Sequence, residues 1–195
     1  SEIAAAANLT LEAHGIARRP VAEIADLIGA GTRELMLKLL ARCTLEQPSL
    51  APTLRPEAVL ASFDQHYAAT TGTSAVAYGG CTEALSKLRV AGVRLACTTN
   101  KELRHTQRVL AATRLADYFD LVIGGDSLPE KKPHPLPFLH ICERFGITPA
   151  EALVVGDSRN DVAGARAAGC PVFCVPYGYS ECEDVRDLGA DAIVG

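Results

Sequence analysis

The sequence predicts an α/β protein in which a core built on a parallel sheet follows a small domain made only of helices. Two patterns support this prediction. Over residues 1–76 the apolar residues recur at helical spacing, without a strand-like run between them. From about residue 77, helical segments alternate with short apolar runs, which is typical of parallel strands joined by helical crossovers. We therefore expect an all-α domain at residues 1–76 and a Rossmann-like α/β core at residues 77–195.

Four amphipathic helices are expected in the first part, because four sets of apolar residues each fall on one helical face. These sets are Ile3, Ala7 and Leu11; Val21, Ile24, Ala25 and Ile28; Leu35, Met36, Leu39, Leu40 and Cys43; and Val59, Leu60, Phe63 and Tyr67. The stretch Gly29-Ala30-Gly31-Thr32 predicts an exposed turn between the second and third helices. Four short helices of this kind can bury their apolar faces against one another as a small bundle.

The α/β part is expected to contain strands and helices in regular alternation. Strands are predicted at residues 93–98, 121–123, 153–155, 171–175 and 190–194, and helices at 82–90, 102–115, 135–145 and 162–168. The four apolar residues before Gly156 indicate a short buried strand. We expect the last strand to be cut short by the end of the chain.

Composition narrows the class of protein. The chain has 195 residues, of which 48% are apolar, and a net charge of −4 without a block of Lys or Arg. These features argue against a nucleic-acid partner, and no apolar run is long enough for a membrane span. The seven cysteines are odd in number and contain no C-x-x-C pair, so reduced thiols and a cytoplasmic location are expected. A zinc site formed by Cys170, Cys174 and Cys182 is the less favoured alternative, because their spacing is unusual for such sites.

Two carboxylates follow one of the predicted strands. Asp157 stands directly after Gly156, at the carboxyl end of the strand, and Asp161 follows four residues later at the start of a helix. Open α/β sheets bind their ligands at this edge, and paired carboxylates there suit a hard cation such as Mg²⁺. The alternative is a purely structural role, in which one Asp caps the helix and the second is favoured by the helix dipole.

Two further strands are followed by polar residues that could bind phosphate. Thr99 and Asn100 close the strand at 93–98, and Lys132-Pro133 follows the strand at 121–123 by a few residues. Each signal is weak alone, because Thr and Asn often cap helices and paired lysines are usually solvated. Together, a hydroxyl, a lysine and a carboxylate pair at one sheet edge have the composition of a phosphoryl-transfer site.

These motifs resemble those of the haloacid dehalogenase superfamily. Thr99-Asn100, Lys132-Pro133 and the segment from Gly156 to Asp161 are similar to its motifs II, III and IV, in the same order. Thr99-Asn100-Lys101, residues 122–126 and residues 131–135 are typical of its phosphoglycolate phosphatase-like branch. The resemblance implies that the helical part is the cap domain of this branch. It also implies that Gly29-Ala30-Gly31-Thr32 is the cap loop that closes over substrate.

The resemblance also implies roles for individual residues. Thr99 would bind the transferred phosphoryl group and Asn100 would support the loop. Lys132 would bridge the phosphate and a nucleophilic carboxylate. Asp157 would bind Mg²⁺, and Asp161 would orient Lys132 or a metal-bound water. The reaction would pass through an aspartyl-phosphate that water then hydrolyses.

Motif I, D-x-D-G-T, does not occur in the sequence. In this superfamily it carries the nucleophilic aspartate on a strand between those of motifs II and IV. We therefore expect the motif just upstream of Ser1, and expect the chain as it stands to be inactive. A missing strand would also leave backbone groups of its two neighbours unpaired.

The expected function is Mg²⁺-dependent hydrolysis of small phosphorylated metabolites, with 2-phosphoglycolate as the leading substrate. Thr32 and Arg33 of the cap are the candidates for substrate specificity, and the protein is expected to be a monomer or homodimer. A sugar phosphomutase, a phosphonatase and a catalytically dead binding module of the same fold remain alternatives. A phosphonatase would want a cap lysine near the site, and Lys38 is the only lysine in the cap. A receiver domain is disfavoured, because its acidic cluster comes first in the chain and its Lys last.

Overall fold

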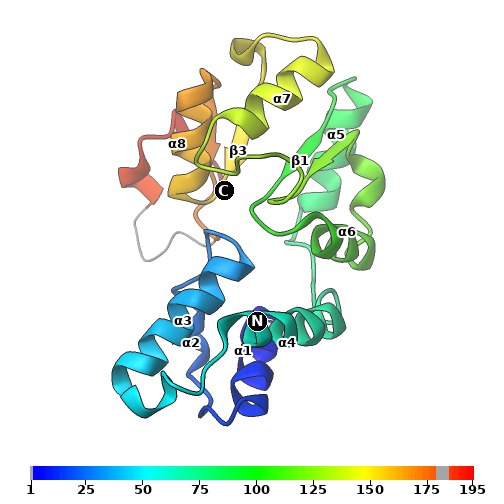
Figure 1. The fold of residues 1–195 in the computed structure, drawn as a ribbon. Helices are drawn as coiled ribbons and strands as arrows, with labels where there is room; N and C mark the ends of the chain where they lie inside the picture. The colour runs from blue at the N-terminus through cyan, green and yellow to red at the C-terminus, as the bar shows by residue number, and fades with distance from the viewer. Residues whose placement is uncertain (1, 179–184) are drawn as a thin grey trace.

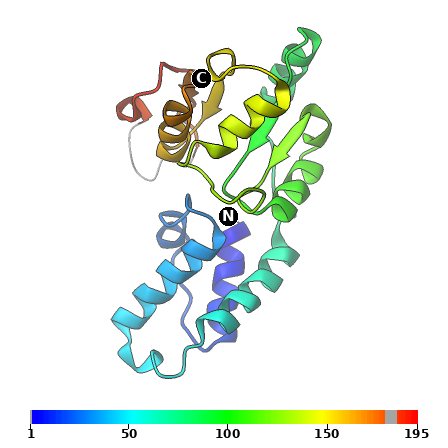
Figure 2. The same ribbon diagram turned by 45° about the horizontal axis from the view of Figure 1, so that its top comes forward.

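The structure is a computed structural model, and it describes residues 2–178 and 185–195. It has two parts, one made of α1–α4 and one made of strands with helices around them (Figure 1). A second view shows the same division, with the start of α1 close to the junction between the two parts (Figure 2). No helix in the described ranges is both long and apolar enough to cross a membrane. Cys182, one of the three cysteines considered for a zinc site, lies outside the described residues.

The first part contains the four helices that the apolar stripes predict. They are α1 (Glu2–Ala13), α2 (Val21–Ala25), α3 (Thr32–Glu46) and α4 (Pro56–Thr70), with a 3-10 turn at Pro48–Leu50 before α4. The turn at residues 29–31 separates α2 from α3, and Gly31 adopts a φ of 99°, which favours glycine. This loop and the start of α3 face the second part of the molecule (Figure 1).

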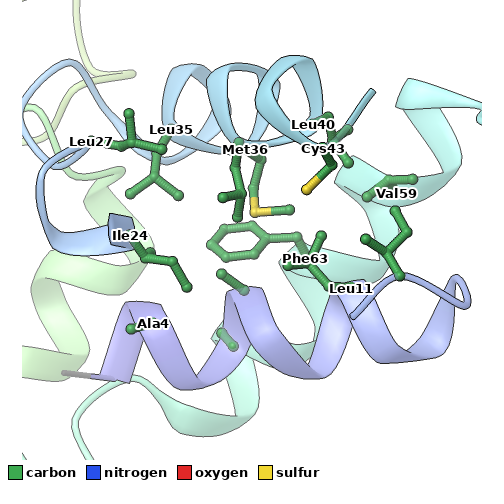
Figure 3. Packing of buried hydrophobic residues seen from close by; sticks show 14 of the residues in the cluster. Ala4, Leu11, Ile24, Leu27, Leu35, Met36, Leu40, Cys43, Val59 and Phe63 are labelled. Atoms are coloured by element: carbon green, nitrogen blue, oxygen red, sulfur yellow. The ribbon is translucent and has the colours of Figure 1, made fainter. Parts of the chain in front are cut away.

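One apolar cluster holds the four helices together. Figure 3 shows Leu11 of α1, Met36 of α3 and Phe63 of α4 converging between the helices. All three side chains are buried, as is Ile24 of α2. Val21 is the exception to the predicted stripes, since it is 53% exposed. The helix α2 is only five residues long, so it presents one buried position rather than a full apolar face.

The second part alternates helices and strands as predicted. Its helices are α5 (Cys81–Val90), α6 (Leu103–Ala112), α7 (Leu136–Phe145) and α8 (Arg159–Ala168). Its strands are β1 (Ala96–Thr98), β2 (Leu121–Ile123), β3 (Val154–Gly156), β4 (Val172–Cys174) and β5 (Ala192–Ile193). Short 3-10 turns lie at Ala116–Tyr118, Pro149–Glu151 and Val185–Leu188. This order confirms the α/β fold class.

All strand pairs are parallel, but the strands form two separate sheets. β1 pairs with β2, and β4 lies between β3 and β5. Within the described residues, β1 and β3 therefore each pair along one edge only. These are the two strands that lead into Thr99 and Asp157.

The prediction that the strand before Gly156 is buried was wrong. Leu153 is 52% exposed and Val155 is 58% exposed, although both are apolar. Residues in a strand are buried by neighbouring strands and covering helices, and β3 pairs only with β4. The opposite side of the same sheet is well packed, because Val172 and Cys174 of β4 are fully buried against α7 and α8.

Candidate active site

The loops that follow the strands converge on a pocket of about 500 Å³ between the two parts. Thr99, Asn100, Lys132, Asp157 and Asp161 all line it from the α/β side. The helical part contributes residues from the segment that leads into α3 and from α1, α3 and α4. These are Glu2, Ile3, Ile28, Gly29, Gly31, Thr32, Leu35 and Tyr67. The structure thus brings together side chains that stand more than 60 residues apart in sequence.

Lys132 connects the two sheets at the floor of this pocket. Its Nζ donates hydrogen bonds to the carbonyl oxygen of Thr98 at 2.8 Å and to Oδ1 of Asp161 at 2.7 Å. Thr98 is the last residue of β1, and Asp161 lies in the first turn of α8, the helix that follows β3. The two side chains are only 10% and 7% exposed, so the ion pair is shielded from solvent. An ammonium fixed in this way carries its charge between the end of β1 and the start of α8.

Asp161 is held by donors from the turn that precedes α8. Its Oδ2 accepts hydrogen bonds from the Ser158 hydroxyl at 2.6 Å, the Ser158 N–H at 3.1 Å and the Asp157 N–H at 3.2 Å. Burial works to raise the pKa of Asp161, but the Lys132 charge and these hydrogen bonds together hold the pKa below its usual value. The carboxylate is therefore ionised and fixed in position.

The close approach of Asp161 to the backbone explains why position 156, directly before Asp157, is a glycine. A Cβ at position 156 would overlap the Asp161 side chain, with Cγ at 2.6 Å and Oδ2 at 2.9 Å. The backbone of Gly178 similarly approaches Asp157, where a Cβ would overlap the carboxylate. Both carboxylates thus occupy space that only glycine leaves open.

The loop after β1 is fixed by backbone and amide contacts. The Thr99 N–H donates to the carbonyl of Ile123 at 3.0 Å, and Thr99 Oγ1 accepts from the Lys101 N–H at 3.2 Å. The side-chain amide of Asn100 donates to the carbonyls of Lys132 at 2.8 Å and Gly29 at 2.9 Å. Asn100 therefore joins the loops after β1 and β2 to the turn at residues 29–31.

The two residues expected to govern specificity lie in different places. Thr32 lines the pocket, and its hydroxyl donates to the carboxylate of Glu102. Arg33 points elsewhere: it is not among the lining residues, its side chain is 64% exposed, and it pairs with Glu57 at 3.3 Å. Successive residues of a helix face different directions, which is why one of the two reaches the pocket and the other does not.

Glu2, Tyr67 and Lys101 are among the pocket-lining residues that were not predicted as site residues from the sequence. Tyr67 belongs to an apolar helical stripe, and Lys101 follows two motif residues in a loop. No pattern in the sequence predicts that Tyr67 and Lys101 are neighbours, because their contact depends on how the two parts of the molecule pack together.

The donor set available for a metal ion consists of carboxylates. Asp157 and Asp161 line the same pocket, and oxygen ligands of this kind are those that Mg²⁺ prefers. Over residues 2–178 and 185–195, no group of three or more His, Cys, Asp or Glu side chains is placed to hold a metal. The described residues thus fit part of a Mg²⁺ site, and Asp161 is already engaged by Lys132.

The family model of haloacid dehalogenase-like hydrolases matches residues 1–169 of this sequence. The chain belongs to this hydrolase family. A phosphoglycolate phosphatase of Nitrosospira multiformis is 47% identical over 193 residues, covering 99% of this chain and 84% of that relative. A phosphoglycolate phosphatase of Thiobacillus denitrificans is 42% identical over the same shares of the two chains. For this hydrolase, the family and these homologues support phosphatase activity.

Solved structures of other proteins have the same fold. A crystal structure described as a predicted phosphoglycolate phosphatase of Haemophilus somnus has a TM-score of 0.84 at 31% identity. The match covers 98% of this chain and 85% of that one. CbbY of Rhodobacter sphaeroides, solved with phosphate, has a TM-score of 0.79 at 23% identity, which concerns the fold alone. The resemblance to the superfamily and its phosphoglycolate phosphatase-like branch, inferred from motifs, is confirmed.

Proposed function

We propose that this hydrolase is a Mg²⁺-dependent phosphatase of small phosphorylated metabolites, with 2-phosphoglycolate as its leading substrate. The observation that carries the proposal is the position of Lys132. Its ammonium joins the end of β1 to Asp161 in the pocket that Thr99 and Asp157 also line. A fixed cation, a hydroxyl and carboxylate oxygens in one pocket form a site suited to a phosphoryl group.

Each residue has a distinct task in this proposal. The Thr99 hydroxyl binds a phosphoryl oxygen, and Asn100 keeps the loop after β1 in place. Lys132 offsets the charge of the phosphoryl group and of the attacking carboxylate. Asp161 holds the Lys132 ammonium in position. Asp157 would be a ligand of Mg²⁺, which supplies further positive charge for the phosphoryl oxygens when it is bound.

The nucleophile in this proposal is an aspartate that lies outside residues 1–195. Its carboxylate attacks phosphorus as the alcohol leaves, giving an aspartyl-phosphate that water hydrolyses to inorganic phosphate. The division of the strands into two sheets supports a position for this aspartate on a strand between β1 and β3. β1 and β3 each pair along one edge only among the described strands, and Val155 of β3 is 58% exposed. A parallel strand between them would satisfy both edges and end beside Lys132.

The proposal is tested with a full-length protein that carries the segment before Ser1. A screen of phosphorylated metabolites, with Mg²⁺ and with a chelator, should show hydrolysis that depends on Mg²⁺ and is fastest with 2-phosphoglycolate. A protein that turns over none of them would contradict the proposal. Transfer of phosphate between two positions of a sugar, without release of phosphate, would indicate a mutase instead.

The metal ligand is tested by Asp157→Asn in the same protein. We expect Mg²⁺-dependent hydrolysis to fall by about 100-fold or more, because the metal contributes several kcal/mol of charge stabilisation. Asp117→Asn is the matched control, since Asp117 is exposed in the turn at Ala116–Tyr118 and does not line the pocket. Undiminished turnover in the Asp157 variant would remove Asp157 from the metal site.

A further inference from the structure

We propose that Lys101, supported by the Tyr67 hydroxyl, is a specificity-determining residue that binds a carboxylate on the leaving group of the substrate. This inference rests on the proposed phosphatase function and names the group that distinguishes one phosphomonoester from another. The substrate class that it predicts is a small phosphomonoester whose alcohol part carries a carboxylate.

Lys101 and Lys132 line the same pocket but contact different residues. The Lys132 ammonium pairs with the Asp161 carboxylate on the α/β side. The Lys101 ammonium reaches toward the helical part, where it contacts the Tyr67 hydroxyl of α4 and lies 4.8 Å from the centre of the Tyr67 ring. The pocket therefore has a second cationic point, on the cap side.

The charge of Lys101 is not neutralised by direct contact with a carboxylate in the described structure. Lys132 has Asp161 at 2.7 Å, whereas no described carboxylate oxygen lies within 4.0 Å of the Lys101 ammonium. Glu2 is near enough for the Lys101 charge to help lower the pKa of its carboxyl, although burial opposes this shift most strongly. The Glu2 carboxylate accepts hydrogen bonds from the N–H groups of Gly72 at 2.9 Å and Ser74 at 2.6 Å and from the Ser74 hydroxyl. Its oxygens are thus engaged elsewhere, and Lys101 can serve an anion in the pocket.

Tyr67 is fixed well enough to act as a second contact. Its side chain is only 1% exposed, and its ring stacks on Phe63 at 5.4 Å and lies 4.5 Å from the ring of His105. A hydroxyl that accepts a hydrogen bond from Lys101 still has its own proton to donate to a carboxylate oxygen. Positioned donors of this kind lose little freedom when the ligand binds.

Apolar side chains share the pocket with this second cation. Ile3, Leu35 and Val109 line the pocket together with Lys101 and Tyr67. An ion pair formed beside apolar side chains is stronger than one formed in open solvent. A site that provides charged donors for a carboxylate also discriminates against a neutral analogue, because its donors would be left without partners.

The test compares two substrates of the same length in a full-length protein. These are 2-phosphoglycolate and 2-hydroxyethyl phosphate, in which a hydroxymethyl group replaces the carboxylate. For Lys101→Met we expect kcat/KM for 2-phosphoglycolate to fall by about 10- to 100-fold, as loss of one hydrogen bond to a charged group implies. For 2-hydroxyethyl phosphate the change in kcat/KM should stay within about threefold, because its uncharged leaving group forms no ion pair with the Lys101 ammonium.

Further variants separate recognition from general damage. Lys101→Arg should recover part of the preference, and Tyr67→Phe should weaken it less than Lys101→Met does, since the ring packing is kept. Lys87→Met removes the same charge from α5, where the side chain is 75% exposed and outside the pocket, and should change neither substrate.

Two results would overturn the inference: an equal loss for both esters in Lys101→Met, or a wild-type protein without preference for the carboxylate. Hydrolysis of neither ester by the wild type would instead contradict the proposed phosphatase function. Calorimetric binding of 2-phosphoglycolate then decides the inference separately. Weaker binding by Lys101→Met than by wild type supports it, and equal binding overturns it.

Discussion

Lys132 and Asp161 form a buried pair whose two members depend on each other. Each side chain is at most 10% exposed, and the two are 2.7 Å apart. A charge in such a place is costly without its partner, because little water can solvate it. Asp161 also accepts the hydrogen bonds from Ser158 that close the turn before α8, so the pair is linked to the position of this turn.

We expect Lys132→Met in the full-length protein to lower the free energy of unfolding by about 3–5 kcal/mol at pH 7, because it leaves the Asp161 carboxylate buried and unpaired. The double variant Lys132→Met/Asp161→Asn should lose clearly less than the sum of the two single variants. Urea unfolding of the four proteins measures this coupling. Additive losses would mean that the pair contributes nothing as a pair.

The segment formed by β3, its turn and α8 shows how an element places two carboxylates. Ser158 and Asp161 form a capping box, in which the side chain of each accepts a hydrogen bond from the backbone of the other. Gly156 then lets the strand pass against the Asp161 side chain, which a Cβ would displace. The segment that begins with Gly156 and Asp157 therefore stabilises the start of α8, and the same contacts hold Asp161 in the pocket.

Gly156→Ala tests this dependence. We expect it to reduce the free energy of unfolding by about 1–3 kcal/mol, because the added methyl group forces Asp161 away from Lys132. Activity should fall with it. Gly79→Ala is the matched control, since a Cβ there meets no atom within 4 Å, and its effect should stay within about 0.5 kcal/mol. A harmless Gly156→Ala would show that Asp161 can be held in another way.

Local patterns in the sequence predict these elements well. Helical spacing identifies the buried faces around Leu11, Met36 and Phe63, and the alternation in the second part places the five strands within a few residues. The order of Thr99, Lys132 and Asp157 after successive strands predicts that they share one sheet edge. They line one pocket, but among the described strands β1 and β3, which lead into Thr99 and Asp157, belong to separate sheets. Burial of a strand is different, because it depends on neighbours: Val155 is apolar yet half exposed, since β3 pairs only with β4 among the described strands. The placement of Lys101 beside Tyr67 likewise depends on how the two parts meet.

In the whole molecule, the two parts meet through polar contacts from the loops after β1 and β2 and from α6, besides the ring contact between Tyr67 and His105. The Asn100 amide reaches the Gly29 carbonyl, Lys131 donates to the carbonyl of Ala30, and Arg104 and Arg108 contact α4. These contacts place the turn before α3 over the strand ends (Figure 2). Interfaces made of such contacts allow relative movement of the parts more readily than apolar ones do. The pocket therefore lies between two parts whose contacts leave room for relative movement.

His105 is a buried titratable group at this junction. It belongs to α6, is 1% exposed, and packs on the Tyr67 ring of α4. Neither ring nitrogen has a hydrogen-bond partner among the described residues, although Nε2 lies 3.7 Å from Asp64 Oδ1. Burial is the main cause that lowers the pKa of His105, and the charges of Arg104 and Lys101 act in the same direction. The carboxylates of Glu102 and Asp64 oppose this shift only in part.

The lowered pKa makes the stability of the protein depend on pH. Below about pH 6.5 the unfolded chain binds a proton at this histidine and the folded protein does not, so stability is complete above that pH and falls as the pH decreases toward the folded-state pKa. The slope from this one group is at most about 1.4 kcal/mol per pH unit. His105→Phe keeps an aromatic ring at the junction and removes the titration. Urea unfolding of the full-length protein at pH 7, 6 and 5 should therefore show a shallower loss of stability in this variant than in the wild type. The same substitution at His14, which is exposed beyond α1, tests whether the effect requires burial. Parallel pH profiles for wild type and His105→Phe would mean that the junction opens enough on acidification to solvate the imidazolium, so the comparison measures how firmly the two parts are held together.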